Sequence, residues 1–336
     1  MKTLITGCSG YIGSRLCDII NKKYKNLPIQ GIDLNFYSQN KESKFLVIKK
    51  DIRNVNNSDL HLVSSVIHLA ALSNDPLGEL SKSLTEDINY RATVRLASLA
   101  KRNKVKKFIF ISTQSVYGIS KYKKKTIKEN DKNIRPITEY AKSKLKAEKY
   151  LLSIASKDFC VTILRPATVH GPSKNFRSDI VLNNLCASAY TTGKIVVKTN
   201  GKPYRPVLYI DDLCKVIIAC LYKKNKEINR LVMNVGYPKK NFTIIQLAHL
   251  VKKIFRKSEV VIRNEPSHDE RSYRVNFNKI SKKFKTVINF KNKNIVDDIK
   301  KIKNFFVKSS FTKKDFKGPK TNRILMILKL IKEKKK

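Results

Sequence analysis

Residues 7–13 read Gly-Cys-Ser-Gly-Tyr-Ile-Gly, directly after the apolar run at 2–6 and directly before a helix-like stretch. The three glycines stand at a spacing of three. A helix N-terminus offers unpaired backbone N–H groups and a partial positive charge, so a pyrophosphate binds there if no side chain blocks its approach. The stretch therefore predicts a strand, a phosphate-binding turn and a helix, the first unit of a dinucleotide-binding α/β domain.

A carboxylate completes this pattern. Asp33 closes the next apolar run, residues 29–33, twenty residues after Gly13. A carboxylate at this place accepts hydrogen bonds from both hydroxyls of an adenosine ribose and repels a 2′-phosphate. The sequence therefore favours NAD over NADP as the cofactor. The alternative is a tight turn followed by a surface aspartate.

Composition bounds the class of protein. The chain has 336 residues, 41% of them apolar, which fits one large α/β domain with a smaller lobe. No apolar stretch approaches the roughly 20 residues that span a bilayer, and no charged leader precedes an apolar signal core, so we expect a cytoplasmic protein. The six cysteines show no metal-ligand spacing and the five histidines do not cluster, which predicts free thiols and no structural metal.

The net charge of +45 is spread along the chain, with an excess at the C-terminus. A lysine-rich coding bias explains it as well as a partner does. A positive field also attracts an anionic nucleotide substrate, or nucleic acid without sequence preference. No basic motif interleaved with aromatic residues occurs, so the sequence predicts no specific nucleic-acid partner.

The apolar runs predict the fold. Runs of strand length lie at 2–6, 28–33, 45–48, 65–69, 106–112 and 160–165, and most gaps between them show helical periodicity. This alternation predicts a Rossmann fold, a doubly wound parallel sheet in the α/β class. Beyond Pro166 the alternation becomes irregular, with helices expected at 179–192 and 211–222 and strands at 195–197 and 231–235. Thr243 and Gln246 predict a capping box at the start of a further amphipathic helix. We therefore expect an NAD-binding domain over 1–165 and a smaller C-terminal α/β substrate lobe over 166–312, some segments of which return to the first domain.

Two further segments are distinctive. The lysine-rich stretch 121–135 is typical of a solvated loop, or of a flap near the site. Residues 313–336 form a basic tail in which the apolar run 324–331 is flanked by Arg323 and Lys332. This pattern is typical of a helix that makes weak contact with a membrane surface through basic anchors, and equally of a helix packed on a neighbouring subunit or on the lobe.

Tyr140 and Lys144 stand four residues apart in a helical stretch, so one face carries both side chains. A neighbouring ammonium and an oxidised nicotinamide both favour the phenolate of a tyrosine, which makes the pair a usable proton acceptor. The strand at 108–111 is followed by the hydroxyl-rich segment 112–118, at the strand end where open α/β sheets bind ligands. Thr113 lies in this segment and can hold a substrate oxygen.

With these motifs in order, the chain resembles the extended short-chain dehydrogenases/reductases, in particular the NAD-dependent nucleotide-sugar epimerases and dehydratases. The resemblance covers roughly residues 1–290. It is carried by the glycine loop 7–13, Asp33, Asp51-Ile52, His68-Leu-Ala-Ala71, Asn89, the segment 112–118, Tyr140 with Lys144, the segment 164–172 and the segment 205–212.

The resemblance implies a role for each matching position. The residues implied for NAD binding are Gly7, Gly10, Tyr11, Ile12, Gly13, Asp33, Asp51, Ile52, Leu69, Ala70, Ala71, Asn89, Tyr140 and Lys144. The catalytic residues implied are Thr113, Tyr140 and Lys144. The residues implied for the nucleotide-sugar substrate are Thr168, Asn184, Arg205 and Arg271. A homodimer formed through the helices at 86–103 and 138–156 is a further expectation of the family.

The residues after Thr113 favour one reaction within the family. Related 4,6-dehydratases carry an Asp-Glu pair there, an acid and a base for removing water, whereas this chain has Gln114 and Ser115. Oxidation and reduction at sugar carbon 4 need neither, so we expect a nucleotide-sugar 4-epimerase.

The alternatives are a dehydratase, or a 4-ketoreductase or dehydrogenase, of the same fold. A rival from another class is a nonenzymatic Rossmann protein that binds RNA or a membrane. Thr168 stands where many relatives have asparagine, and His170 where an aromatic residue is usual, so the sugar stays open. The loop 73–76 and the segment 175–179 either contact the sugar or form a polar turn and a helix cap.

Overall fold

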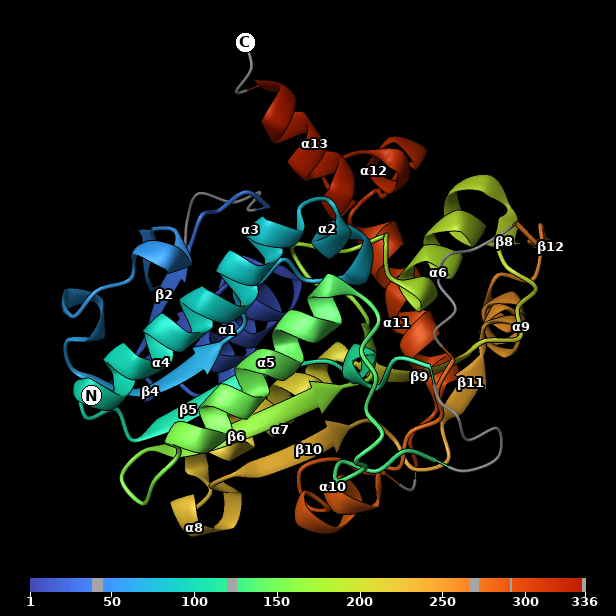
Figure 1. The fold of residues 1–336 in the computed structure, drawn as a ribbon. Coiled ribbons are helices and arrows are strands. Elements are labelled where there is room, and N and C mark those ends of the chain that lie inside the picture. The colour runs from blue at the N-terminus through green and yellow to red at the C-terminus, as the bar shows by residue number, and fades with distance from the viewer. Residues whose placement is uncertain (38–44, 120–125, 266–271, 291, 334–336) are drawn as a thin grey trace.

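The computed structural model describes residues 1–37, 45–119, 126–265, 272–290 and 292–333. In these residues seven parallel strands form one sheet in the order β10-β6-β5-β4-β1-β2-β3 (Figure 1). The strands are β1 (Lys2–Thr6), β2 (Ile29–Asp33), β3 (Leu46–Lys49), β4 (Val63–His68), β5 (Lys107–Ile111), β6 (Cys160–Pro166) and β10 (Leu231–Val235). The predicted doubly wound Rossmann fold is confirmed.

Helices cover both faces of this sheet. On one face lie α4 (Ala92–Arg102) and α5 (Glu139–Ile154), and on the other lie α1 (Tyr11–Lys23) and α7 (Ile210–Tyr222). Successive side chains of a strand point to opposite faces. Leu4 of β1 accordingly belongs to the core beneath α4 and α5, whereas Ile5 belongs to the core that α1 and α7 share with the smaller lobe.

Local signals set the helix starts. Thr138 caps α5 by accepting a hydrogen bond from the Ala141 N–H at 3.2 Å. Thr243 and Gln246 form the predicted capping box of α9 (Ile244–Ile254). Two short helices, α2 (Asp75–Glu79) and α3 (Lys82–Glu86), and a π-helical turn at Asp87–Arg91 join β4 to α4.

The chain after Pro166 builds a smaller lobe and also returns to the main sheet. A three-stranded sheet contains β7 (Thr168–His170), β9 (Tyr204–Tyr209) and β11 (Asn241–Thr243), and β8 (Lys194–Val197) pairs with β12 (Glu259–Ile262). The helices are α6 (Val181–Thr192), α8 (Asn225–Ile228), α9, α10 (Asn278–Lys283), α11 (Ile295–Lys308), α12 (Lys313–Lys317) and α13 (Arg323–Glu333). Strand β10 extends the seven-stranded sheet beside β6.

Contacts between the first helix and the smaller lobe fix the two parts against each other. The Tyr11 hydroxyl donates to the Gly171 carbonyl at 2.7 Å, and the Arg15 guanidinium pairs with Asp211 at 2.6 Å. Tyr11 is also the first residue of α1, so the turn that precedes it is held from the lobe side.

The described part of the lysine-rich stretch is a loop in which Lys128, Lys132 and Arg135 are exposed, as predicted, but which is attached to the protein at one buried residue. Residues 120–125 lie outside the described part of the chain. Ile127 is buried and forms a β-bridge with Val275, so the remainder of the stretch is attached to the lobe.

The start of the C-terminal helix decides between the two readings of the tail. A basic membrane anchor at Arg323 is wrong, because Arg323 is 2% exposed and donates to the Asn175 carbonyl, which agrees with the alternative of a helix packed on the lobe. Leu325, Leu328 and Ile331 of α13 are exposed, and in Figure 1 this helix projects from the body. No helix in the described residues is long and apolar enough to cross a membrane. All six cysteines are buried free thiols.

Candidate active site

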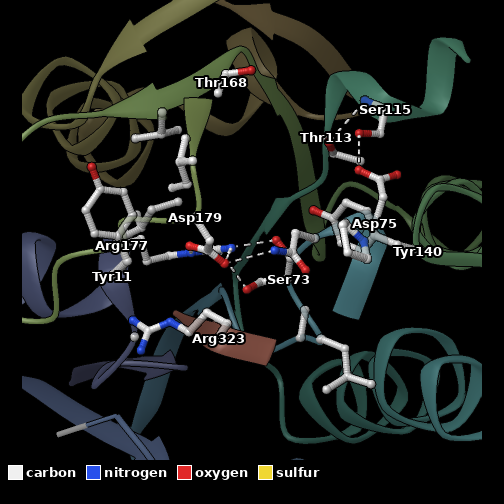
Figure 2. A pocket seen from close by; sticks show the side chains of 18 of the residues that line it. Tyr11, Ser73, Asp75, Thr113, Ser115, Tyr140, Thr168, Arg177, Asp179 and Arg323 are labelled. Atoms are coloured by element: carbon white, nitrogen blue, oxygen red, sulfur yellow. Dashed lines mark hydrogen bonds and ion pairs between the residues drawn. The ribbon is translucent and has the colours of Figure 1, made fainter. Parts of the chain in front are cut away.

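A cavity of about 600 Å³ opens at the carboxyl ends of the parallel strands, and Figure 2 shows part of its lining. The ends of β1, β2, β4, β5 and β6 form one side, and β7, α6, β8 and β9 form the other. The structure brings the following sequence-derived residues to this cavity: Gly7, Gly10, Tyr11, Ile12, Gly13, Asp33, Asp51, Ile52, Leu69, Ala70, Ala71, Thr113, Tyr140, Lys144, Thr168, Asn184 and Arg205. Arg271 lies outside the described residues.

The glycine turn fits a pyrophosphate. Gly10 caps α1 without a side-chain hydrogen bond, which leaves the first N–H groups of the helix for a ligand. Gly7 adopts φ +72°, a conformation that favours glycine. A Cβ on Gly13 would lie 2.1 Å from the Gly7 carbonyl oxygen, and one on Gly7 would lie 2.7 Å from the Ala70 nitrogen. The turn is therefore closed against β4 and open toward the cavity.

Two carboxylates line the cavity near the ends of β2 and β3. Asp33 accepts hydrogen bonds from the Ser9 N–H at 3.0 Å and the Asn35 N–H at 2.8 Å. Burial raises the pKa of Asp33, and these two N–H groups oppose that effect. Asp51 forms an ion pair with Arg53 at 2.7 Å, and the hydrogen bond from Arg53 lowers the pKa of Asp51. The positions fit an adenosine, as Asp33 lies at the strand end expected for its ribose.

A neutral histidine holds the end of β4 in place beside the cavity. His68 at the end of β4 is fully buried, with its two ring nitrogens 2.7 Å from the Thr6 hydroxyl and 2.8 Å from the Thr93 hydroxyl. Burial, reinforced by the charge of Lys144, lowers the pKa of His68 to about 3. The uncharged ring therefore ties β1, β4 and α4 together directly before Leu69, Ala70 and Ala71.

Asn89 lies behind the cavity and is not among its lining residues. It is fully buried. Its Oδ1 accepts from the Leu72 N–H at 2.8 Å, and its Nδ2 donates to the Leu72 carbonyl at 3.2 Å and to the Ser143 hydroxyl at 3.3 Å. Asn89 thus holds the loop after β4 against α5.

Thr113, Tyr140 and Lys144 meet in the cavity. The Thr113 side chain forms a hydrogen bond with Tyr140, which lowers the pKa of Tyr140, while burial and the charge of Asp75 raise it more strongly. The Lys144 ammonium donates to the Ile111 carbonyl at 2.9 Å. Burial lowers the pKa of Lys144 to about 7. The chain alone therefore holds Tyr140 protonated, and the phenolate expected from the sequence requires a further positive charge.

Asp75 is an acidic group whose place beside Tyr140 the sequence did not reveal. It is 7% exposed, and its carboxylate accepts from the Ser115 hydroxyl at 3.1 Å (Figure 2). It also accepts from the Thr138 hydroxyl. Gly78 allows this approach, because a Cβ there would lie 2.9 Å from the Tyr140 Cβ. A carboxylate thus stands beside Tyr140, although no acidic residue directly follows Thr113 in the sequence.

The loop 73–76 and the segment 175–179 interlock at the cavity. Asn74 caps α2 by accepting from the Leu77 N–H at 2.9 Å, so part of the loop is a helix cap. Arg177 forms a bidentate pair with Asp179, with both distances 2.9 Å, and donates to the Ser73 hydroxyl at 3.1 Å. The two segments therefore form one charged wall of the cavity.

The expected substrate residues lie on the lobe side of the cavity. Asn184 donates through Nδ2 to the Ser178 carbonyl at 2.8 Å. Arg205 is 8% exposed, donates to the Tyr204 carbonyl at 3.0 Å and lies over the Tyr273 ring, 5.8 Å from its centroid. Thr168 stands at the start of β7. The lobe side thus offers a guanidinium, an amide and a hydroxyl.

The C-terminal tail contributes two lining residues that the sequence did not place there, Arg323 and Ile327. The Arg323 guanidinium lies over the Tyr37 ring, 3.7 Å from its centroid. A buried arginine in a basic tail carries no distinguishing sequence signal. In the described residues no group of three or more His, Cys, Asp or Glu side chains is placed to hold a metal ion.

Comparison with known proteins adds the family. The model of the NAD dependent epimerase/dehydratase family matches residues 3–236. An uncharacterised UDP-glucose epimerase, YtcB, of Bacillus subtilis (strain 168) is 30% identical over 240 residues, 66% of this chain and 73% of that protein. The dTDP-D-glucose 4,6-dehydratase of Dictyostelium discoideum is 31% identical over 250 residues, 66% of this chain and 56% of that protein.

A solved structure agrees with these relatives. The UDP-glucuronic acid 4-epimerase of Bacillus cereus, in complex with UDP-glucuronic acid and NAD, superposes with a TM-score of 0.76 and 26% sequence identity. The superposition covers 92% of this chain and 100% of that one. Epimerases and dehydratases thus both occur among the similar proteins, and NAD is bound in a similar structure.

Proposed function

The chain belongs to the NAD dependent epimerase/dehydratase family, so it is an NAD-dependent enzyme of that family, and we propose that it is a nucleotide-sugar 4-epimerase. One observation carries the proposal: Thr113, Tyr140 and Lys144 meet at the cavity, while the residues that follow Thr113 are Gln114 and Ser115. The three residues suffice for proton transfer at carbon 4. No acid and base pair for removing water follows them.

Tyr140 is the proton carrier of the proposed mechanism. It takes the proton of the hydroxyl on carbon 4 and, after the keto sugar has turned over in the cavity, returns this proton to the ketone oxygen. Bound NAD would supply the acceptor for the hydride of carbon 4 and its return to the opposite face of that carbon, so the reaction would have no net redox change. Thr113 orients the phenol and stabilises its charged form through their hydrogen bond.

Lys144 supplies a positive charge beneath the site. Burial lowers its pKa to about 7, so a neighbouring negative charge, such as a Tyr140 phenolate, favours the protonated form. On the lobe side, Arg205, Asn184 and Thr168 would hold the nucleotide diphosphate, in which the guanidinium matches the charge of the phosphates.

Turnover of a substrate panel tests the proposal. Purified protein is incubated with UDP-, GDP-, CDP- and dTDP-sugars without added reductant, and products are followed by proton NMR and by absorbance near 340 nm. We expect an epimer with no net change in NADH. Tyr140→Phe should abolish turnover and keep NAD bound, whereas Tyr222→Phe, whose ring is 63% exposed, should be fully active. An active Tyr140→Phe enzyme would contradict the assignment.

A 4,6-dehydratase is the second candidate, and Asp75 favours it. Its carboxylate beside Ser115 and Tyr140 could remove a sugar proton next to the C4 ketone in place of the missing pair. The same panel run in D₂O separates the two reactions. An epimerase leaves carbon 5 unlabelled, whereas a dehydratase introduces deuterium there and yields a keto sugar. Asp75→Asn should lower dehydration by about 100-fold or more and should leave epimerisation within about tenfold.

We also propose that two copies pair through α4 and α5. These helices lie side by side on one face of the sheet in Figure 1. Light scattering of the purified protein should give twice the chain mass of 38.6 kDa. A monomeric mass would refute the pairing.

A further inference from the structure

The C-terminal segment 312–333 reaches back to the cavity, although it lies outside residues 3–236 that match the family model. Arg323 and Ile327 are its two lining residues. Figure 2 shows Arg323 next to Ser73 and the Arg177–Asp179 pair. A segment that ordinary sequence patterns describe as a tail is thus part of the cavity wall.

Hydrogen bonds fix this segment beside the charged wall. The Ser178 N–H donates to the Thr321 carbonyl at 3.0 Å, and the Ser178 hydroxyl donates to the Phe316 carbonyl at 3.1 Å. Thr321 is 3% exposed, and its hydroxyl donates to the Asp315 carbonyl at 2.6 Å. Ser178 directly follows Arg177. The segment 175–179, which forms part of the charged wall, therefore also holds the chain that leads to Arg323.

The Arg323 guanidinium is buried with part of its hydrogen-bonding capacity unused. Its Nη2 donates to the Asn175 carbonyl at 3.1 Å, while its Nη1 has no hydrogen-bond partner. Burial and the like charge of Arg177 lower the pKa of Arg323 to about 10. A buried, incompletely paired cation is costly unless an anion joins it. The side chain is 2% exposed and lines the cavity, so only a group bound in the cavity is positioned to join it.

The neighbouring carboxylates are already engaged. Asp179 forms its bidentate pair with Arg177, and Asp33 accepts from the Ser9 and Asn35 N–H groups. No ion pair joins Arg323 to an acid among the described residues. Since Arg323 lines the cavity, an anionic ligand bound there is placed to neutralise it.

The surroundings of Arg323 indicate which ligand. Asn175 connects it to the glycine turn, because the Asn175 carbonyl accepts from Arg323 and the Asn175 amide donates to the Ser9 carbonyl at 2.6 Å. Its stacking partner Tyr37 follows Asp33 by four residues. Arg323 thus belongs to the cofactor side of the cavity, whereas Arg205 and Asn184 lie on the lobe side.

We propose that Arg323 binds the diphosphate of NAD, so that the segment 312–323 acts as a strap that retains the cofactor. The free N–H groups of α1 and the guanidinium are complementary donors to one diphosphate. The proposal rests on NAD as cofactor and is independent of the sugar and of the reaction at carbon 4. Its test is accordingly a binding measurement without turnover.

Calorimetric titration of the full chain freed of NAD tests the proposal. The probes are NAD, adenosine diphosphoribose, which keeps the diphosphate, and adenosine, which lacks it. NADP and UDP are titrated in the same way as comparisons. Arg323→Met should weaken NAD and adenosine diphosphoribose by about 10- to 100-fold and adenosine by less than about twofold. Lys329→Met, on the same helix with its side chain 56% exposed, should bind all three like the wild type.

Thermal unfolding distinguishes ligand binding from a structural role. If Arg323 serves to bind NAD, the NAD-free Arg323→Met protein should unfold at the wild-type temperature or above it. Added NAD should then raise its unfolding temperature by less than it raises that of the wild type. Arg323→Lys keeps the positive charge but loses the planar guanidinium that can donate two parallel hydrogen bonds. Its affinity for NAD should lie between those of the wild type and Arg323→Met. It also serves as the variant to measure if Arg323→Met does not fold.

Four results would overturn the proposal. These are unchanged NAD affinity in Arg323→Met, an equal loss of adenosine binding, a greater loss for NADP than for NAD, and a loss of UDP binding with NAD binding intact. A greater loss for NADP would indicate that Arg323 binds a 2′-phosphate. A loss of UDP binding alone would indicate that it binds the diphosphate of the nucleotide sugar.

Discussion

Replacement of Gly13 by alanine tests the phosphate-binding turn directly. The new Cβ would lie 2.1 Å from the Gly7 carbonyl oxygen and 2.8 Å from the Cys8 Cα. Both obstacles are backbone atoms, so no side chain can rotate away. The turn would have to retreat by about 0.9 Å to reach 3.0 Å, the limit below which real Cβ contacts essentially do not occur. A displacement of this size breaks hydrogen bonds from the turn to a phosphate. The loss of about two such bonds to a charged group, roughly 1.5 kcal/mol each, weakens binding on the order of 100-fold.

The expected result is therefore a loss of NAD affinity of about 100-fold, even though alanine favours a helix more than glycine does. Titration of NAD into protein freed of cofactor measures it. Gly10→Ala is the graded comparison, because its Cβ would lie 3.2 Å from the same carbonyl and needs a shift of only a few tenths of an ångström.

Gly193→Ala is the control for backbone strain. Gly193 has φ +67°, and no atom lies within 4 Å of a Cβ added there. The substitution should therefore lower the free energy of unfolding by about 1 kcal/mol and leave NAD affinity unchanged. The reasoning would be refuted by a Gly13→Ala protein that binds NAD within about threefold of the wild type.

Three further predictions concern stability. Lys144→Met should stabilise the NAD-free protein by roughly 3–5 kcal/mol at pH 7 and by steadily less toward pH 10.5, because the folded-state pKa is about 7 and folding releases the proton between these values. Urea unfolding of both proteins across this range measures the difference, and a difference independent of pH would contradict it. Glu148→Gln leaves the Arg165 guanidinium, 4% exposed, without its anion and should cost about 3–5 kcal/mol. Glu265→Gln, from a half-exposed pair, should cost less than about 1 kcal/mol in the same thermal unfolding assay, and equal losses would refute the distinction. Phe306→Ala should cost about 3–5 kcal/mol, since its fully buried ring stacks on Phe311 at 4.5 Å, and a chemical denaturation midpoint near that of the wild type would contradict this.

The sequence predicted those features whose causes are local. Each parallel strand is a short apolar run, the glycine turn lies within seven residues, and the capping box of α9 spans four. Residues four apart on a helix share a face, which placed Tyr140 and Lys144 together. These relations hold before the chain folds back on itself, so one sequence suffices to recognise them.

Features that depend on distant segments could not be predicted in this way. Asp75 receives a hydrogen bond from Thr138, 63 residues later, and Arg323 donates to Asn175, 148 residues earlier. A basic residue before an apolar run is typical of a solvated helix start, and nothing in that pattern signals burial. β10 likewise has the composition of an ordinary strand, and only its pairing with β6 places it in the main sheet.

The position of Asp75 changes how Tyr140, the proposed proton carrier, is understood. The absence of an acid after Thr113 in the sequence does not mean that the site lacks one, because a carboxylate arrives from the loop after β4. Burial and that carboxylate both raise the pKa of Tyr140, and the Thr113 hydrogen bond only partly opposes them. A positive charge beside the phenol is therefore needed before it accepts a proton. Oxidised nicotinamide carries such a charge and the reduced form does not, so we propose that the basicity of Tyr140 follows the redox state of the cofactor. This would suit the proposed reaction, in which Tyr140 takes a proton only while carbon 4 is being oxidised.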